Sequence, residues 1–211
     1  GGNLAATATA GNMTDSGTLT ITGTTTLTTS ANDATIALDT TTNAFTGAVT
    51  ITTNDSVGTD ADVTIDGGTT ALILAASTVG GNLAATATTG NMTDSGALAI
   101  TGTTTLTTSA NDATIALDTT TNAFTGAVTI TTNDSSGTDA DVTIDGGTTA
   151  LVLAASTIDG DLTVTSGNSI TDSGLVTVGG NLAATTDAAN GLINLGTLAV
   201  DGTVQLTTNG N

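Results

Sequence analysis

Aspartate supplies all of the ionisable side-chain chemistry in this sequence of 211 residues. The 19 acidic residues are all aspartate, and the net charge is −19 because the chain has no Lys, Arg or His. Carboxylates gathered near turn carbonyls are the ligands that Ca²⁺ prefers. Two copies of one motif, NDSVGTDADVTIDGG and NDSSGTDADVTIDGG, therefore supply candidate calcium ligands: Asp55, Asp60, Asp62 and Asp66, and then Asp134, Asp139, Asp141 and Asp145.

These aspartates have an alternative role as solvated turn residues that keep the protein soluble and limit sideways association. Neither an EF-hand loop nor a GGxGxD repeat is present. Two aspartates stacked at ~4.8 Å would repel each other by only about 0.9 kcal/mol in water, so a ladder of carboxylates is tolerable without metal. The sequence predicts that no cofactor is required, and calcium is its one candidate ligand.

Catalysis would have to use aspartate as its only acid, base or nucleophile, because His, Cys, Lys, Tyr and Glu are all missing. Paired aspartates can cleave glycosides. Here, however, the chain has no Trp or Tyr to stack on a sugar ring and no Arg to hold a uronate. Nucleic-acid binding needs cationic side chains to neutralise phosphates. The sequence therefore predicts a protein that is not an enzyme and has no nucleic-acid partner.

A long internal repeat dominates the sequence. Residues 1–78 recur at residues 80–157 with an offset of 79 and no gap. A third, diverged copy begins near Ile158. We therefore predict one continuous domain with sequence repeats 1–79, 80–158 and 159–211. The first two copies differ only at Ala10/Thr89, Thr18/Ala97, Thr20/Ala99, Val57/Ser136 and Ile73/Val152.

Short segments in which apolar residues alternate with threonine recur along each repeat, as in TTLTT at Thr104 and VTITT at Val128. This period of two is typical of a half-buried strand, and threonine favours the pleated surface of a sheet. Clusters of Gly, Asn, Asp and Ser between the segments supply turns. No segment has a sustained helical period, so the sequence predicts an all-β fold.

The strand segments are too short to bury their apolar side chains alone, which predicts a parallel β-solenoid (β-helix) in which successive coils stack. Related coil starts are separated by about 23 to 30 residues, which suggests three coils per 79 residues and about eight coils of about three short strands each. Equivalent aspartates would then lie about three coils, or ~14 Å, apart. Phe45 and Phe124 would fill the core or a corner. The proposed coil starts are Leu98, Val128, Leu151, Leu175 and Leu198.

The Gly-punctuated segments GTLTITGTTTLTT, GNMTDSG and GGNLAAT resemble the coil repeats of filamentous-haemagglutinin-type adhesins and related giant bacterial surface proteins. The resemblance covers nearly the whole chain. It implies a right-handed β-helix, secretion to the cell surface or the extracellular space, and a structural role as a stalk or adhesive fibre.

The expected partner is the protein itself, because neither terminus carries a capping sequence and an open coil end invites further pairing. Either head-to-tail stacking or continuation of one long chain would satisfy such ends. No apolar run approaches the ~18 residues of a membrane helix. Glycans could be attached to exposed threonines or at the Asn-x-Ser/Thr sites Asn12, Asn54, Asn91 and Asn133.

Two further functions are compatible with this fold. The chain could be the stalk of an adhesin whose binding tip lies elsewhere. It could also bind ice through ladders of threonine, suggested by Thr-x-Thr segments at Thr18, Thr24, Thr50 and Thr129. Ice binding requires these threonines to lie in register on consecutive coils, and the uneven coil lengths argue against that.

Overall fold

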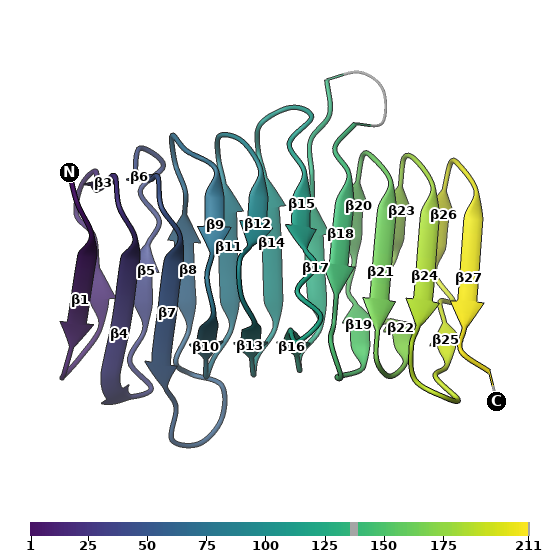
Figure 1. Ribbon diagram of the computed structural model, residues 1–211, viewed down its shortest axis with the longest axis horizontal. Helices are drawn as coiled ribbons and strands as arrows, with labels where there is room; N and C mark the ends of the chain where they lie inside the picture. Colours follow the sequence, from purple (N-terminus) through teal and green to yellow (C-terminus); the bar gives the residue numbers. More distant parts are fainter. Residues whose placement is uncertain (136–138, 211) are drawn as a thin grey trace.

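The computed structural model describes residues 1–135 and 139–210 (Figure 1). In this part of the chain all regular secondary structure is β-strand, without any helix. Its 27 strands pair in parallel with strands about one turn away, which confirms the predicted parallel β-solenoid with three strands per turn. There are about nine turns rather than eight. Within the described residues, no helix is long and apolar enough to cross a membrane. The right-handed sense of the coil stays a prediction.

The strands form two long parallel sheets and one short one. Face 1 is the 13-stranded sheet and contains β1 (Leu4–Ala8), β4 (Thr25–Asn32), β7 (Val49–Asn54), β9 (Leu72–Leu74), β10 (Ser77–Val79), β12 (Met92–Asp94), β13 (Leu98–Ile100), β15 (Ile115–Leu117), β16 (Ala123–Phe124), β18 (Val142–Asp145), β21 (Leu162–Ser166), β24 (Leu182–Thr186) and β27 (Val204–Thr208). Face 2 is the 12-stranded sheet and contains β2 (Met13–Thr14), β5 (Ile36–Leu38), β8 (Val63–Asp66), β11 (Leu83–Ala87), β14 (Thr104–Thr108), β17 (Val128–Thr131), β19 (Leu151–Leu153), β20 (Ser156–Ile158), β22 (Ile170–Asp172), β23 (Val176–Val178), β25 (Ile193–Asn194) and β26 (Leu198–Val200). The short sheet pairs β3 (Thr20–Ile21) with β6 (Ala44–Phe45).

The sequence repeat does not contain a whole number of turns. Residues 1–79 hold ten strands, β1 to β10, and residues 80–158 hold the equivalent ten, β11 to β20. Following the pairs up face 1, Leu4 lies under Thr25, Val49 and Leu74, three turns higher, and the next copy begins at Leu83 on face 2. Each repeat therefore takes about three and a half turns. The LAATA strand is on face 1 as β1 and on face 2 as β11, and its diverged counterpart β21 is on face 1 again (Figure 1).

The expectation of three coils per repeat was therefore wrong. The proposed coil starts mixed faces, since Leu98 begins a strand of face 1 and Val128 a strand of face 2. The equivalent aspartates of successive repeats consequently lie on different faces, and the ~14 Å stacking distance does not apply to them.

A long strand in each repeat bridges two strands of the next turn. Val49 of β7 pairs with Leu74 of β9, and Thr52 of the same strand pairs with Thr78 of β10. Strand β17 repeats this arrangement with β19 and β20. At the same level the short sheet ends at β6, where an isolated antiparallel bridge joins Ala44 to Gly68.

The core is a continuous column of aliphatic side chains inside the coil. In β14, Leu106 points inward and is fully buried, while its neighbour Thr105 is exposed, as the alternating pattern predicts. Phe45 and Phe124 are both fully buried, which confirms their prediction as core residues. Alternation along each strand thus leaves threonine and alanine on the outside of the faces and places most aspartates at the strand ends and turns between them.

Candidate functional surface: acidic corners and threonine faces

Asp62 and Asp141 accept hydrogen bonds from the next turn. The carboxylate of Asp62 accepts from the backbone N–H of Asn82 at 2.7 Å and from its side-chain amide at 3.0 Å. Asp141 accepts from the backbone N–H of Asp161 at 2.8 Å. A carboxylate that accepts backbone donors in this way joins two turns at a corner where strand pairing is absent.

Asp66 and Asp145 occupy equivalent positions but have different surroundings. Both accept a hydrogen bond from the backbone N–H two residues later, at 2.7 Å. Asp66 also accepts from the hydroxyl of Thr88 at 2.8 Å, whereas the second repeat has Gly167 at the position of Thr88. Burial raises the pKa of Asp145, and the nearby carboxylates of Asp187, Asp118 and Asp94 raise it further.

Two carboxylate pairs were not foreseen from the sequence. Asp55 hydrogen-bonds to Asp33 of the turn below, and Asp33 also accepts from the backbone N–H and the hydroxyl of Ser56, both at 3.1 Å. Burial, followed by the Asp33 contact, raises the pKa of Asp55, and the hydrogen bond from the backbone of Ser56 lowers that of Asp33. In the second repeat, Asp112 and Asp134 are paired in the same way.

The eight predicted calcium ligands do not form one site. Asp60, Asp139 and Asp141 are exposed, and the other five lie at separate corners and strand ends. In the part of the chain that the structure describes, no three carboxylates come together in a group that could hold a metal ion. What the arrangement can do chemically is accept hydrogen bonds from backbone donors and spread negative charge along the corners. Calcium dependence of the protein stays a prediction to be tested.

Removal of divalent cations is expected to leave the melting temperature unchanged, because the corner carboxylates are held by backbone and side-chain donors within the chain. The measurement is thermal unfolding followed by circular dichroism in EDTA and in millimolar CaCl₂, with MgCl₂ as the control for ionic strength. A melting temperature that rises by several degrees in CaCl₂ alone would contradict this expectation and support a calcium role.

Mild acidification is expected to stabilise the fold. A carboxyl group whose pKa is raised by folding binds its proton more tightly in the folded state, so its contribution to stability is present at low pH and is lost as the pH rises through the folded-state pKa. Asp55 and Asp145 are of this kind, whereas Asp33, Asp112 and Asp172 have lowered pKa values and lose stability only below the ordinary range of aspartate.

Urea unfolding should therefore give a higher midpoint at about pH 4, near the ordinary pKa of aspartate, than at pH 7, and a lower one again as the pH falls further. Asp145→Asn should raise the midpoint at pH 7 and flatten this dependence, because the amide oxygen still accepts from Gly147. Asp66→Asn is the matched control, since it changes a carboxylate that accepts a hydrogen bond from Thr88. A midpoint that falls steadily from pH 7 to pH 4 would show that the raised pKa values do not govern stability.

Two buried asparagines, also missed in the sequence, each bind three groups from neighbouring segments of the coil. Asn122 is 1% exposed; its side-chain oxygen accepts from the backbone N–H of Leu98 at 2.8 Å, and its amide donates to Asp94 at 2.8 Å and to the carbonyl of Leu117 at 3.3 Å. Asn43 makes the equivalent contacts in the first repeat. The segment TTTNAFT that contains them reads as a turn, so only the structure shows that the asparagine is enclosed.

The outward threonines lie in register on consecutive turns. On face 2 a single file of five runs along the axis through the pairs of β11, β14, β17, β20 and β23; it comprises Thr86, Thr107, Thr131, Thr157 and Thr177. A second file beside it contains Thr105 and Thr129. Unequal turn lengths are absorbed in the loops, so the predicted loss of register does not occur on this face.

The four candidate glycosylation sites differ in how their amides are used. All four asparagines are exposed. The side-chain oxygens of Asn12 and Asn91 accept from Thr35 and Thr114 of the next turn, both at 3.0 Å. Asn54 and Asn133 instead use the amide nitrogen, which donates to Asn32 and Asn111. Because this nitrogen is the atom that carries an N-linked glycan, Asn12 and Asn91 are the better placed sites.

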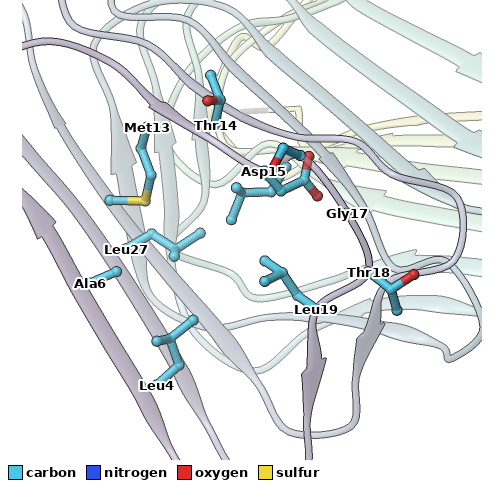
Figure 2. Close-up of a pocket in the computed structure, with 11 residues that line it drawn as sticks. Leu4, Ala6, Met13, Thr14, Asp15, Gly17, Thr18, Leu19 and Leu27 are labelled. Atoms are coloured by element: carbon cyan, nitrogen blue, oxygen red, sulfur yellow. The ribbon is translucent and has the colours of Figure 1, made fainter.

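A pocket of about 520 Å³ lies at the N-terminal end of the rod, where the first turn has no turn beneath it. Its apolar side chains come from the inner positions of the first two turns and point toward one another in Figure 2. The one carboxylate in its lining is Asp15, which accepts a hydrogen bond from Asn43. The pocket is therefore the open end of the core. Its lining is Leu4, Ala6, Met13, Thr14, Asp15, Ser16, Gly17, Thr18, Leu19, Leu27 and Leu38.

Comparison with known proteins gives one match. The family model described as repeats of unknown function (DUF5649) matches residues 1–52, 60–131 and 139–190, which together make up more than half of the chain. Neither a curated protein nor a solved structure matches.

Proposed function

Since the chain belongs to the family of repeats of unknown function (DUF5649), whose description assigns no activity, we propose from its architecture that it is an extracellular structural protein that forms or extends a surface fibre or stalk. The observation that carries this proposal is the uninterrupted core. One column of aliphatic side chains runs through all the turns, and parallel strand pairing follows the rod axis. Such a body provides length and stiffness.

The side chains of the rod support a structural role rather than catalysis. Carboxylates such as those of Asp62 and Asp145 accept hydrogen bonds between or within turns, and the pocket at the N-terminal end is lined mainly by core residues. The protein is accordingly proposed not to be an enzyme and to need no cofactor. Lacking Lys and Arg, it also offers no cleavage site to trypsin-like proteases, which suits a surface-exposed fibre.

Electron microscopy and cell labelling test this proposal. The purified chain should appear as a short rod on the order of 40 Å long, as about nine turns at ~4.8 Å require. Antibodies against the chain should label intact cells of the source organism, and the signal should persist after trypsin treatment and be lost after treatment with a broad-specificity protease. Labelling only after cell lysis would overturn the surface role.

The resemblance to filamentous-haemagglutinin-type proteins favours one version of this role, the stalk of an adhesin whose binding tip lies elsewhere. The threonine and alanine faces support that version because they are uncharged and present few large apolar side chains for a ligand to grip. Beads coated with the purified chain should therefore not adhere to host cells or to a glycan array. Specific adhesion would place a binding tip within these residues.

Ice binding is a second candidate, favoured by the file of five threonines in register on face 2. A regular array of hydroxyl and methyl groups can order the water layer beside it. The two files of threonine run side by side for only a few turns, because the threonine-rich strands lie on the other long sheet in the next repeat. Thermal hysteresis, the difference between the melting and freezing temperatures of ice, distinguishes the two functions. An ice-binding protein must give a value clearly above that of buffer, and Thr107→Lys should abolish it.

A further inference from the structure

A loop of the first repeat projects from the side of the rod. It consists of residues 55–62 and connects β7 to β8, whereas only residues 33–35 connect the equivalent strands β4 and β5 in the turn below. In Figure 1 this loop, drawn in blue, extends beyond the neighbouring turns at that edge of the rod. Residues 56–60 are all exposed. The tip of the loop thus lies outside the two long sheets.

Both ends of this loop are held by the rod. At one end Ser56 donates its backbone N–H and its hydroxyl to Asp33 of the turn below, both at 3.1 Å. At the other end Ala61 is fully buried, and Asp62 accepts a hydrogen bond from the next turn at 2.7 Å. Residues 57–60 therefore form an arch between two fixed points. Exposed loop tips of small and polar residues are where proteases preferentially cut folded proteins.

Val57, in this arch, is the most exposed of the large hydrophobic residues that the structure describes. Its exposed fraction is 84%, against 57% for Leu192. The next residue is Gly58, which has a φ of 107°, and a methyl group placed on it would approach only the side chain of Asp60. Within the described residues, no main-chain hydrogen bond involves Val57 or Gly58. The peptide bond that joins them is therefore accessible and free of the strand ladder.

We propose that the Val57–Gly58 bond is a processing site for an elastase-type serine protease, and that the cleaved protein remains one rod. The small S1 pocket of such a protease accepts a small aliphatic side chain, which Val57 supplies. Cleavage breaks the C–N bond and consumes one water. The water oxygen completes the Val57 carboxylate, and its two hydrogens go to the nitrogen of Gly58, which becomes an ammonium group. The proposal does not depend on the stalk function.

Other exposed aliphatic residues are less suited because their backbone is held in the sheets. The carbonyl of Leu175 accepts from the backbone N–H of Ser156 at 2.9 Å, and that of Leu192 accepts from Ile170 at 2.8 Å. A protease must bind the carbonyl that it attacks in its own oxyanion hole. The strand pairs would therefore have to open locally before either bond could be cut.

The two products would stay together because they share strand pairs and core. Strands β5 and β7 belong to residues 1–57, whereas β8, β9 and β10 belong to residues 58–211. β5 pairs with β8, and β7 pairs with both β9 and β10. Val49 of β7 and Leu74 of β9 pair with each other, and each is at most 1% exposed. Separation of the two pieces would expose this apolar surface to water.

The test is limited digestion of the full chain with pancreatic elastase, followed by mass spectrometry. Residues 1–57 and 58–211 should be the first products, and they should elute together from a size-exclusion column under native conditions. The matched control is Val57→Ser, which gives this loop the sequence of the second repeat, where Ser136 stands at the same position. It removes the side chain that would fill the S1 pocket, so the first cut should slow by about tenfold or more.

Three results would overturn the proposal. The first is initial cleavage at another bond, such as the one after Ala10 or Ala189. The second is an equal rate of cutting in the Val57→Ser variant, which would show that the Val57 side chain does not select the site. The third is an intact native chain under conditions in which elastase digests the urea-unfolded chain. Products that separate on the native column would overturn the claim that the cleaved protein remains one rod.

Discussion

Asn122→Ala is expected to destabilise the protein by about 3–5 kcal/mol, one of the largest effects of any single side chain in the rod. The amide is enclosed and holds three groups on neighbouring strands. Without it, the backbone N–H of Leu98 loses its acceptor at 2.8 Å, and the Asp94 carboxylate loses its amide donor. One carboxylate oxygen of Asp94 is already buried without a partner, so the carboxylate would keep only the longer hydrogen bond from the backbone N–H of Thr119, at 3.3 Å.

Urea unfolding at pH 7, followed by circular dichroism, measures this effect. Asn168→Ala is the control, because Asn168 is exposed and its side chain makes only a weak contact with Ser169 at 3.4 Å; it should change stability by no more than about 0.5 kcal/mol. Asn122→Asp adds a second readout. It should be as damaging as alanine at pH 7 and should recover as the pH falls, since protonation of either carboxyl restores a donor toward its neighbour. If Asn122→Ala lowered the free energy of unfolding by less than about 1 kcal/mol, the three hydrogen bonds would not contribute substantially to stability.

Gly126→Ala is expected to destabilise the protein by about 3 kcal/mol, because the corner at Gly102 and Gly126 has no room for a side chain. A methyl group on Gly126 would overlap the carbonyl of Gly102 in the turn below. These neighbours are backbone atoms, so they cannot move aside without spreading the two turns. Spreading would weaken the strand pairs of β14 with β17, which begin two residues after this corner.

Gly17→Ala separates crowding from the general effect of replacing glycine. Nothing lies within 4 Å of a methyl group at Gly17, and its φ is not in the left-handed region. This variant should be as stable as the parent protein or more stable by up to about 1 kcal/mol, since alanine reduces the entropy of the unfolded chain. The difference between the unfolding midpoints of the two variants measures the crowding, and equal midpoints would contradict the close approach of the turns.

The fold class could be predicted from the sequence because alternation is a local signal. In TTLTT and VTITT the inward and outward positions follow directly from the period of two, and the structure buries Leu106 and Ile130 as the pattern requires. The number of turns could not be predicted in this way. It depends on which strand lies above which, and segments as alike as LAATA at residues 4–8 and 83–87 occupy different faces.

The candidate site could be predicted only in part, for a similar physical reason. The sequence picks out every aspartate, but whether carboxylates converge depends on spacing between turns. Asp33 is far from Asp55 in sequence and pairs with it in space. Asp60 and Asp62 are close in sequence, yet Asp60 is exposed and Asp62 accepts a hydrogen bond from Asn82 of the next turn. Asn43 shows the same limit, since a polar residue in a threonine-rich turn gives no sign that it will be enclosed.

Repeats of about three and a half turns have a consequence for anything that recognises the rod from the side. A probe bound to one repeat meets its near-identical neighbour on the other long sheet, about 17 Å further along the axis. The same sheet returns with every second repeat, at intervals of about 34 Å. Tandem repeats of this kind would therefore display each epitope alternately on the two long sheets, and neither sheet would carry an unbroken stripe of it.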